Sequence, residues 1–353
     1  MGRLAARDRD RWRELARAAV EPNPFFEPAF VLAAAEHLAE PGTSLLVAED
    51  AEGWRACLPV QTARIARVVP GLRTWRHLYC FLGTPLLDAG AEGPAARTLL
   101  AAGVKAGRPL TLESIADGGP ASAAVRRAAG ELGLVGVVET SHDRALLERT
   151  SGGDPADGLG GHHRRELNRL GRRLETELGG ELSVSDEAGS DAALDRFLEL
   201  ERSGWKGRGH TALGSSPAHA AFFRSVCRAF AADGRLQLLA LSAGNRTVAM
   251  KCNLIAGEGG FCFKIAYDEE LRRFSPGVQL ERENLRNFHA RRTERWQDSC
   301  ADPENEMINR LWPDRRRIWT SVVARRGALA AVSRHAIRAA KAVRGRKESS
   351  ARS

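Results

Sequence analysis

The sequence predicts an α/β protein with two domains, each built on a mixed, largely antiparallel sheet flanked by helices. Three observations support this fold class. The chain has 353 residues, about twice the usual length of one domain. Strand-like and helix-like segments alternate through its first half. In the second half, apolar runs between residues 235 and 267 are separated by short polar turns, which predicts an antiparallel meander.

The first half begins with a helical pattern over residues 8–38 that is broken at Glu21–Pro24. Two strands, Ser44–Glu49 and Trp54–Ala63, follow and are joined by the polar turn Asp50–Gly53, so we expect a hairpin. A third apolar run, Trp75–Leu82, is expected to be a strand. The remaining expected elements are a helix over 91–106, a strand over Leu110–Ile115, a helix over 120–133 and a strand over Leu134–Glu139.

The segment 151–161 is rich in glycine and aspartate, and this composition is typical of a linker. We therefore expect a first domain over 1–155, a second over 156–324 and a basic tail, helical or disordered, over 325–353. A weak internal repeat supports two similar domains, because Leu45–Ala48 and Leu238–Leu241 both follow phenylalanine-rich helices at an offset of about 193 residues.

The second half begins with a basic helix over 163–178 that carries an apolar stripe of leucines. A helix over 190–204 and another over 217–232 follow, and we expect the second to face a core with Phe222, Phe223, Val226 and Phe230. After the meander the chain passes Ser275-Pro276-Gly277 and enters a helix over 277–291.

The positive charge of the chain is concentrated at its end. The formal net charge is +9, and residues 325–353 carry nine Arg and Lys against Glu348 alone, so residues 1–324 are close to neutral. This distribution disfavours a specific nucleic-acid binder. We expect the tail to be a solvated terminus, the alternative being a peripheral contact with anionic lipid of a membrane or with RNA.

Composition also limits the chemistry. The sequence has no apolar run of the roughly 18–20 residues that a membrane helix needs and no secretory signal at its start, so we expect a cytoplasmic protein. Its six cysteines form no C-x-x-C pair and have no histidine at zinc-ligand spacing. We expect free thiols and no metal.

The segment Ser275-Pro276-Gly277 has the pattern of an anion-binding helix terminus. It offers an N-cap hydroxyl, a proline suited to the first helical position and a glycine that lets a ligand approach the backbone. Free N–H groups and the helix dipole attract phosphate at such a terminus, and Arg272 and Arg273 precede it. The alternative is an ordinary capped helix.

This segment resembles the GNAT acyltransferase superfamily, whose loop reads Q/R-x-x-G-x-G/A. Here Arg272–Gly277 reads R-x-x-S-x-G, so Ser275 replaces the first glycine. The sequence further resembles the FemAB and CelD-like branch of double-GNAT proteins associated with cellulose and exopolysaccharide biosynthesis. The residues that carry this resemblance are Arg164–Arg173, Trp205–Arg208, Lys264–Asp268, Ser275–Gly277 and Asp298, within about residues 162–320.

The resemblance implies tandem GNAT-like domains, of which the second binds acetyl-CoA or another acyl-CoA as co-substrate. The implied cofactor-binding residues are Lys264, Arg272, Arg273, Ser275, Gly277, Val278 and Gln279. Acyl transfer needs a general acid and a base. Tyr267 is the candidate acid and Asp298 or Asp268 the candidate base. Each residue also has a structural alternative. Tyr267 would then be an aromatic at the end of a strand, Asp298 a capping or Asx-turn residue, and Asp268 a turn former.

We expect Trp205, Lys206 and Arg208 to bind the acceptor, an amine or hydroxyl of a small molecule or glycan precursor of the cell envelope. Two other functions stay open. One is a FemX-like aminoacyltransferase that takes its donor from charged tRNA, and the other is a non-catalytic GNAT-like binding protein in a polysaccharide-synthesis complex.

Overall fold

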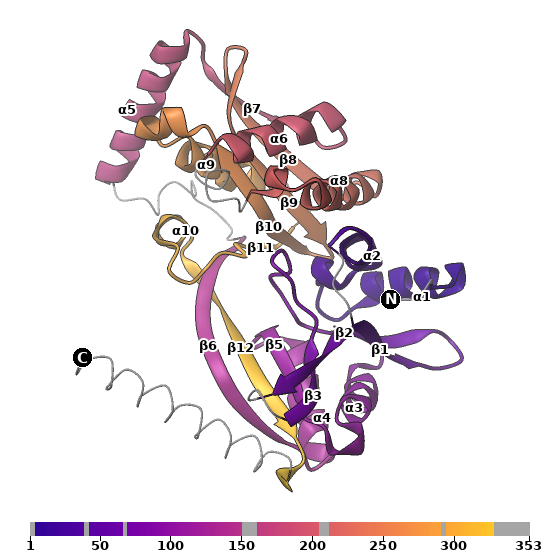
Figure 1. The fold of residues 1–353 in the computed structure, drawn as a ribbon. Coiled ribbons are helices and arrows are strands. Elements are labelled where there is room, and N and C mark those ends of the chain that lie inside the picture. Colours follow the sequence, from indigo (N-terminus) through magenta and orange to yellow (C-terminus); the bar gives the residue numbers. More distant parts are fainter. Residues whose placement is uncertain are drawn as a thin grey trace, which may run out of the picture. The chain divides into compact units, whose positions relative to one another are not determined.

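The computed structural model describes residues 4–38, 42–65, 69–149, 161–204, 212–290 and 294–327 (Figure 1). The chain forms two compact units. Unit 1 consists of Met1–Pro28, Glu40–His142 and the segment from Arg317 onward, and unit 2 consists of Ala29–Ala39 and Asp143–Arg316. This division differs from the expected one. Residues 29–39 of the first half belong to unit 2, and the segment from Arg317 onward, in the second half, belongs to unit 1. Residues 151–160 of the expected linker over 151–161, and residues 328–353 of the expected tail, lie outside the described residues.

Unit 1 contains a sheet in the order β1-β2-β3-β5-β12, to which the first part of β6 also belongs. The expected hairpin is confirmed, because β1 and β2 pair antiparallel and Asp50 accepts hydrogen bonds from the N–H groups of Glu52 and Gly53 in the turn. Pairing of β3 with β5 is parallel, whereas β5 pairs antiparallel with β12. The elements are α1 (Ala6–Ala18), η1 (Pro24–Phe26), β1 (Thr43–Glu49), β2 (Trp54–Ile65), β3 (Val69–Thr74), β4 (Leu86–Leu87), α3 (Glu92–Gly103), η2 (Lys105–Gly107), β5 (Leu110–Ala116), α4 (Pro120–Glu131), β6 (Val135–Glu148) and β12 (Asp314–Ala324).

The expected strand over Trp75–Leu82 is wrong. Residues 75–82 form turns and irregular backbone, and the strand at this point is β3, which ends at Thr74. Trp75, Tyr79 and Leu82 are nonetheless buried, so the apolar pattern reports burial of a loop and not a strand. Beyond this loop, β6 is 14 residues long and extends well past the expected end at Glu139.

Unit 2 contains a sheet in the order β6-β11-β10-β9-β8-β7, with residues 143–148 of β6 at one edge. The expected meander is confirmed as β8, β9 and β10, which pair antiparallel in sequence. Helix α9 follows β10 through the short η5. The elements are α2 (Pro28–His37), α5 (Gly161–Leu178), β7 (Leu182–Asp186), α6 (Asp191–Ser203), η4 (Leu213–Ser215), α8 (Pro217–Ala232), β8 (Leu236–Ala243), β9 (Arg246–Ala256), β10 (Gly259–Tyr267), η5 (Glu269–Phe274), α9 (Pro276–Ala290), β11 (Trp296–Asp298) and α10 (Glu306–Leu311).

An aromatic cluster fixes one face of β10 in unit 2. Phe223 of α8, buried as expected, lies between Phe197 of α6 and Phe263 of β10, with ring centroids 4.9 Å and 6.1 Å away. Phe30 of α2 meets Phe222 and Phe263 edge to face at 5.3 Å and 5.7 Å. Such pairs contribute about 0.5–1.5 kcal/mol each beyond area burial. The cluster therefore holds the middle of β10 against three helices.

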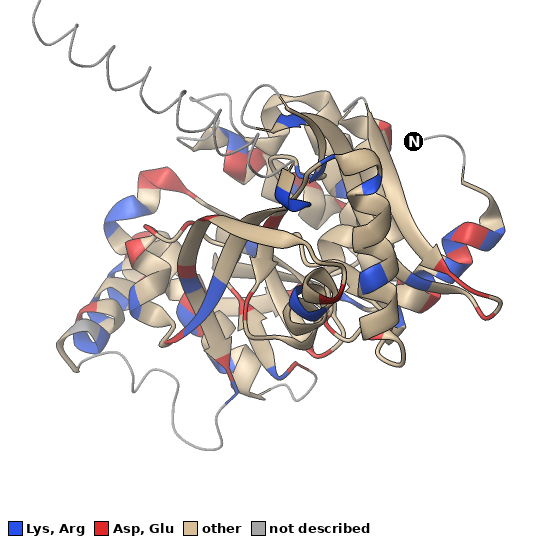
Figure 2. Ribbon diagram, turned by 90° about the horizontal axis from the view of Figure 1, so that it is seen from below, with Lys and Arg blue, Asp and Glu red and all other residues tan. Residues whose placement is uncertain are grey.

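Charge is spread over both units. Figure 2 shows Lys and Arg as well as Asp and Glu on many of the helices and strands, which agrees with the near-neutral balance of residues 1–324. Among the described helices, none is both long and apolar enough to cross a membrane.

Candidate functional site

Strands β10 and β11 of unit 2 begin side by side and then separate. They pair in parallel over only three positions, from Gly259 opposite Trp296 to Phe261 opposite Asp298. Directly after this pairing, the register between β10 and β9 shifts between Cys262 and Lys264, which is a β-bulge at Phe263. A bulge bends its strand and raises the local twist, and bulges are frequent beside active sites. The pairing of β10 with β11 therefore ends directly before the bulge in β10.

The chain also turns sharply where β11 ends. The carboxylate of Asp298 accepts the N–H of Cys300 at 2.9 Å, and Cys300 has a φ of 50°, in the left-handed region. Arg144 of β6 and Arg316 of β12 hold the same carboxylate, with Nη atoms 2.6 Å and 3.1 Å from Oδ2. Left-handed backbone is unfavourable for a side-chain-bearing residue and persists where its surroundings impose it. Asp298 thus fixes the turn that carries the chain away from β10.

The separation of the two strands leaves a cleft in unit 2. One part, of about 190 Å³, is lined by Cys262–Ile265 on β10, by Ser299–Ala301 after β11, and by Lys251, Glu281 and Asn305. A second part, of about 250 Å³, is lined by Ala266 and Tyr267 and by Glu201 of α6. Ile265, Asn305 and Met307 line both parts, so the two lie next to each other along β10. We call this continuous space the β10 cleft.

A buried ion pair forms part of the wall of the β10 cleft. Lys251 of β9 donates to Glu281 of α9, and the two side chains are 3% and 1% exposed. Glu281 also accepts from Asn284 Nδ2 at 2.9 Å and from Trp312 Nε1 at 3.0 Å. Burial alone lowers the pKa of Lys251, but its interactions with Cys262 and Glu281 outweigh burial and keep this pKa raised. Lys251 is therefore a cation at neutral pH in the wall of the cleft.

The cysteines of the cleft are not activated. All six cysteines of the protein are free thiols, as expected. Burial raises the pKa of Cys262 to about 12, and burial also raises that of Cys300. A thiol needs a lowered pKa to act as a nucleophile. No group of three or more His, Cys, Asp or Glu able to hold a metal ion occurs in the part of the chain that the structure describes.

Comparison with protein families assigns the region that contains this cleft. Residues 161–304 match the family described as acetyltransferase (GNAT) domain. The matched residues all lie within unit 2. The match covers less than half of the 353 residues, and among curated proteins none matches this sequence significantly.

Solved structures extend the likeness of fold to both units. The C-terminal domain of a putative lysylphosphatidylglycerol synthetase from Agrobacterium fabrum is 12% identical with a TM-score of 0.56, and the alignment covers 93% of this chain and 94% of that one. FemX is 9% identical with a TM-score of 0.58, covering 89% and 95%. L-PGS from Bacillus licheniformis is 10% identical with a TM-score of 0.50, covering 89% and 97%. The predicted α/β fold, with a mixed and largely antiparallel sheet flanked by helices, is confirmed. The CelD-like assignment is not.

Three of the predicted site residues of the GNAT domain lie in or beside the β10 cleft. Lys264 and Tyr267 line it. Asp298 lies at the end of β11, fully buried. Burial alone raises the pKa of Asp298, but the charges of Arg144 and Arg316 outweigh burial and hold this pKa below its ordinary value. A carboxylate that resists protonation and is covered by two arginines suits a structural role better than that of a base.

Asp268 caps the short helix η5. Its carboxylate accepts the N–H of Glu270 at 3.0 Å and forms an ion pair with Arg246. These are the contacts of a turn-forming residue, the structural alternative considered for this position.

The loop before α9 leads into a helix N-terminus, as predicted, but few backbone N–H groups there are free to bind an anion. Ser275 has a φ of 53° where the GNAT pattern has its first glycine. The N–H groups of Val278 and Gln279 both donate to the carbonyl of Ser275 at 3.0 Å, and Pro276 has no N–H. Gly277 is buried, and a Cβ at this position would lie 3.4 Å from the Tyr267 ring. The ring of Tyr267 therefore lies where we expected a ligand to approach.

The two arginines of this loop differ in whether they form an ion pair. Arg273 pairs with Glu177 at 2.6 Å, whereas Arg272 has no ion pair with any residue that the structure describes. Gln279 points away from the cleft, and its Nε2 donates to the carbonyl of Leu167 on α5 at 2.7 Å. Trp205, Lys206 and Arg208 lie outside the described residues.

Sequence reasoning missed the buried charges of the cleft, although each left a signal. Glu201 is 3% exposed and continues the spacing of the buried residues Leu194, Phe197 and Leu198 on α6. Lys251 stands within a buried run of β9. A charged residue at a position where periodicity demands an apolar one indicates a paired or functional group.

Proposed function

We propose that this protein is an acyltransferase that uses an acyl-CoA, acetyl-CoA foremost, and transfers the acyl group to an amine or hydroxyl of an envelope- or polysaccharide-related acceptor. The observation that carries the proposal is the cleft beside β10, which begins where the pairing of β10 with β11 ends and is lined by Lys264 and Tyr267. The amide-containing arm of CoA would lie along β10 in this cleft.

The donor's phosphates would lie beside the loop that precedes α9. Arg272 and the N–H of Gly277 are the groups available there, since Arg246 pairs with Asp268 and Glu270 and Arg273 pairs with Glu177. Two donors form a weaker anion site than a loop with several free N–H groups. The proposed site therefore depends more on the cleft than on this loop.

In the transfer, the acceptor nitrogen or oxygen bonds to the thioester carbon, the C–S bond breaks, and a proton passes from the acceptor to the leaving thiolate. We propose that the ammonium of Lys264, which lines the cleft, stabilises negative charge on the carbonyl oxygen. The hydroxyl of Tyr267 is the proposed donor of the proton to sulfur.

For the proton of the acceptor we propose Glu201. Its carboxylate lines the same part of the cleft as Tyr267 and is oriented by the N–H of Leu213 at 2.8 Å. A general base has to lie within reach of the proton that it removes. Glu201 lines the cleft, whereas Asp298 does not line it and its oxygens bind Arg144, Arg316 and the N–H of Cys300.

A second candidate function is transfer of an aminoacyl group from charged tRNA. It is favoured by the likeness of fold to FemX and to lysylphosphatidylglycerol synthetase domains over about nine-tenths of this chain. The near-neutral balance of residues 1–324 is unfavourable for binding a polyanion. We therefore place it second.

Calorimetric titration of the protein with acetyl-CoA tests the first proposal. Ala301 lines the cleft, so Ala301→Trp fills it, whereas Ala192→Trp adds the same side chain to an exposed position of α6. We expect binding by the wild type and by Ala192→Trp and its loss in Ala301→Trp. Absence of binding by the wild type would remove the acyl-CoA proposal, and tRNA-dependent, salt-sensitive binding would support the second candidate.

A further inference from the structure

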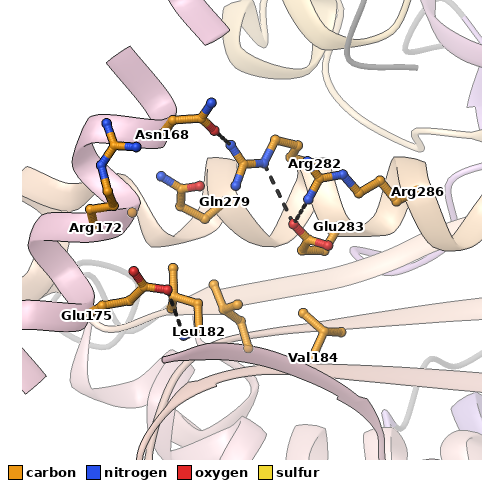
Figure 3. A pocket seen from close by; sticks show the side chains of 11 residues that line it. Asn168, Arg172, Glu175, Leu182, Val184, Gln279, Arg282, Glu283 and Arg286 are labelled. Carbon is orange, nitrogen blue, oxygen red and sulfur yellow. Dashed lines mark hydrogen bonds and ion pairs between the residues drawn. The ribbon is translucent and has the colours of Figure 1, made fainter. Parts of the chain in front are cut away.

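A second pocket of unit 2 lies outside the β10 cleft and shares none of its lining residues. It has a volume of about 360 Å³ and lies between α5 and α9, above β7 and β8 (Figure 3). Leu182, Val184 and Leu241 form its floor. Polar side chains of α5 and α9 form its walls, and they include Arg172, Arg282 and Arg286. We call this space the α5–α9 pocket.

The walls of the α5–α9 pocket carry more positive than negative charge. Their three arginines face two glutamates, Glu175 and Glu283. Glu283 accepts Arg286 at 2.5 Å and lies 3.7 Å from Nε of Arg282, so it is shared between two cations. Arg172 has no acidic partner among the residues that the structure describes. Arginines in excess of carboxylates favour an anionic group, phosphate above all.

Arg282 is held in place as a preformed donor. Its side chain is 12% exposed, and its Nη1 donates to the Oδ1 of Asn168 across the pocket at 2.7 Å (Figure 3). Asn168 is neutral, so it orients the guanidinium without cancelling its charge. A cation that is already desolvated and oriented loses little entropy when an anion binds.

Gln279 offers a hydrogen-bond acceptor that suits a hydroxyl group on the ligand. Its side chain lines the pocket and is 1% exposed, and while Nε2 donates to Leu167, the carbonyl Oε1 has no donor among the described residues. A buried acceptor without a donor is costly. A ligand hydroxyl that donates to Oε1 would remove this cost, so the pocket suits a ligand that carries both a phosphate and hydroxyl groups.

Gly171 keeps the pocket open. It is an interior position of α5, where glycine is unfavourable relative to alanine. Packing does not require it, because a Cβ would meet the Gln279 amide and Leu182 at no less than 3.6 Å, an ordinary contact. The added methyl group would instead narrow the pocket above Gln279.

From these features we infer that the α5–α9 pocket is a binding site for a hydroxyl-bearing phosphate, such as a sugar phosphate or the phosphorylated ribose of a nucleotide. Arg172 and Arg282 bind the phosphate, Gln279 accepts from a hydroxyl, and the aliphatic floor contacts the carbon skeleton. The inference is independent of the proposed acyl transfer, since it uses no residue of the β10 cleft.

The test is calorimetric titration of the full chain with ribose 5-phosphate, inorganic phosphate and ribose. We expect ribose 5-phosphate to bind more tightly than either of the others. Arg172→Gln is expected to weaken it roughly tenfold or more, as for loss of one charge-assisted hydrogen bond. Arg165→Gln, exposed on the same helix but not lining the pocket, is the matched control and should bind like the wild type.

Gly171→Ala separates binding from folding. We expect a higher melting temperature, because alanine favours helix, together with weaker binding of ribose 5-phosphate. Displacement of ribose 5-phosphate by CoA would identify a nucleotide as the natural source, and no displacement would identify a free sugar phosphate. No binding at millimolar ribose 5-phosphate, equal binding of ribose, or equal loss in Arg165→Gln and Arg172→Gln would overturn the inference.

Discussion

Replacement of Asp298 by asparagine tests whether this residue is a structural anchor or a base. The change removes one negative charge from a position that is 0% exposed and leaves Arg144 and Arg316, 4% and 14% exposed, without their counter-ion. Removing one partner of a buried ion pair costs about 3–5 kcal/mol. Asparagine still accepts the N–H of Cys300, so we expect a loss near the lower end of this range.

Urea unfolding followed by tryptophan fluorescence measures this loss. Asp268→Asn is the matched control, because its partner Arg246 is 46% exposed and such pairs contribute up to about 1 kcal/mol. A loss below about 1 kcal/mol for Asp298→Asn would refute the reasoning. If Asp298 were instead the base, the variant would keep its stability and its acetyl-CoA affinity and lose turnover.

The pH dependence gives a second readout of the same pair. The pKa of Asp298 in the folded protein is held below its ordinary value of 3.8, against the effect of burial, by Arg144 and Arg316. The carboxylate therefore contributes its full stabilisation above that ordinary value, and the contribution is lost as pH falls through the lowered pKa. We expect the stability difference between wild type and Asp298→Asn to be constant near neutral pH and to shrink only in strong acid.

Three further changes probe the β10 cleft and its neighbourhood. Lys251→Met should lower the free energy of unfolding by about 3–5 kcal/mol, because it leaves the buried Glu281 without its counter-ion. The double variant Lys251→Met/Glu281→Gln should recover part of this loss, and urea titrations measure both. Gly259→Ala should lower the free energy of unfolding by about 1–3 kcal/mol, since the new Cβ would lie 2.2 Å from the Trp296 ring. A melting temperature equal to that of the wild type would contradict the close packing of β10 on β11. Ser275→Val should cost about 1–2 kcal/mol at a φ of 53°, whereas Ser275→Gly should not, and circular-dichroism melting compares the two.

Elements with strong local signals could be predicted from the sequence. The meander of β8–β10 and the hairpin of β1 and β2 alternate regularly and are bounded by turn residues. Residues 75–82 and strand β3 could not, because a buried loop and a strand have the same apolar composition. The pairing of β12 with β5 was equally out of reach, since nothing local encodes a partner about two hundred residues away.

The candidate site was predictable in position and less so in chemistry. Tyr267 and Lys264 line the cleft, and both were found through the segment that precedes α9. Asp298 is found through the family resemblance, but only the three-dimensional structure shows that Arg144 and Arg316 occupy its carboxylate. The partners of a buried charge come from other elements, so the sequence reveals the charge and not what neutralises it.

Each unit combines segments that are far apart in the sequence, and this affects how the protein folds during synthesis. Strand β5 pairs with β12, which leaves the ribosome about two hundred residues later, roughly ten to forty seconds at ordinary rates of synthesis. Until then one edge of β5 lacks this partner, and α2 already carries Phe30 before its neighbours Phe222 and Phe263 exist. A fragment cut at the glycine-rich segment after residue 150 would lack β12 and would present an apolar helix without its core. The two units are therefore expected to fold as one cooperative product of the whole chain, and neither half should be obtained as a stable fragment.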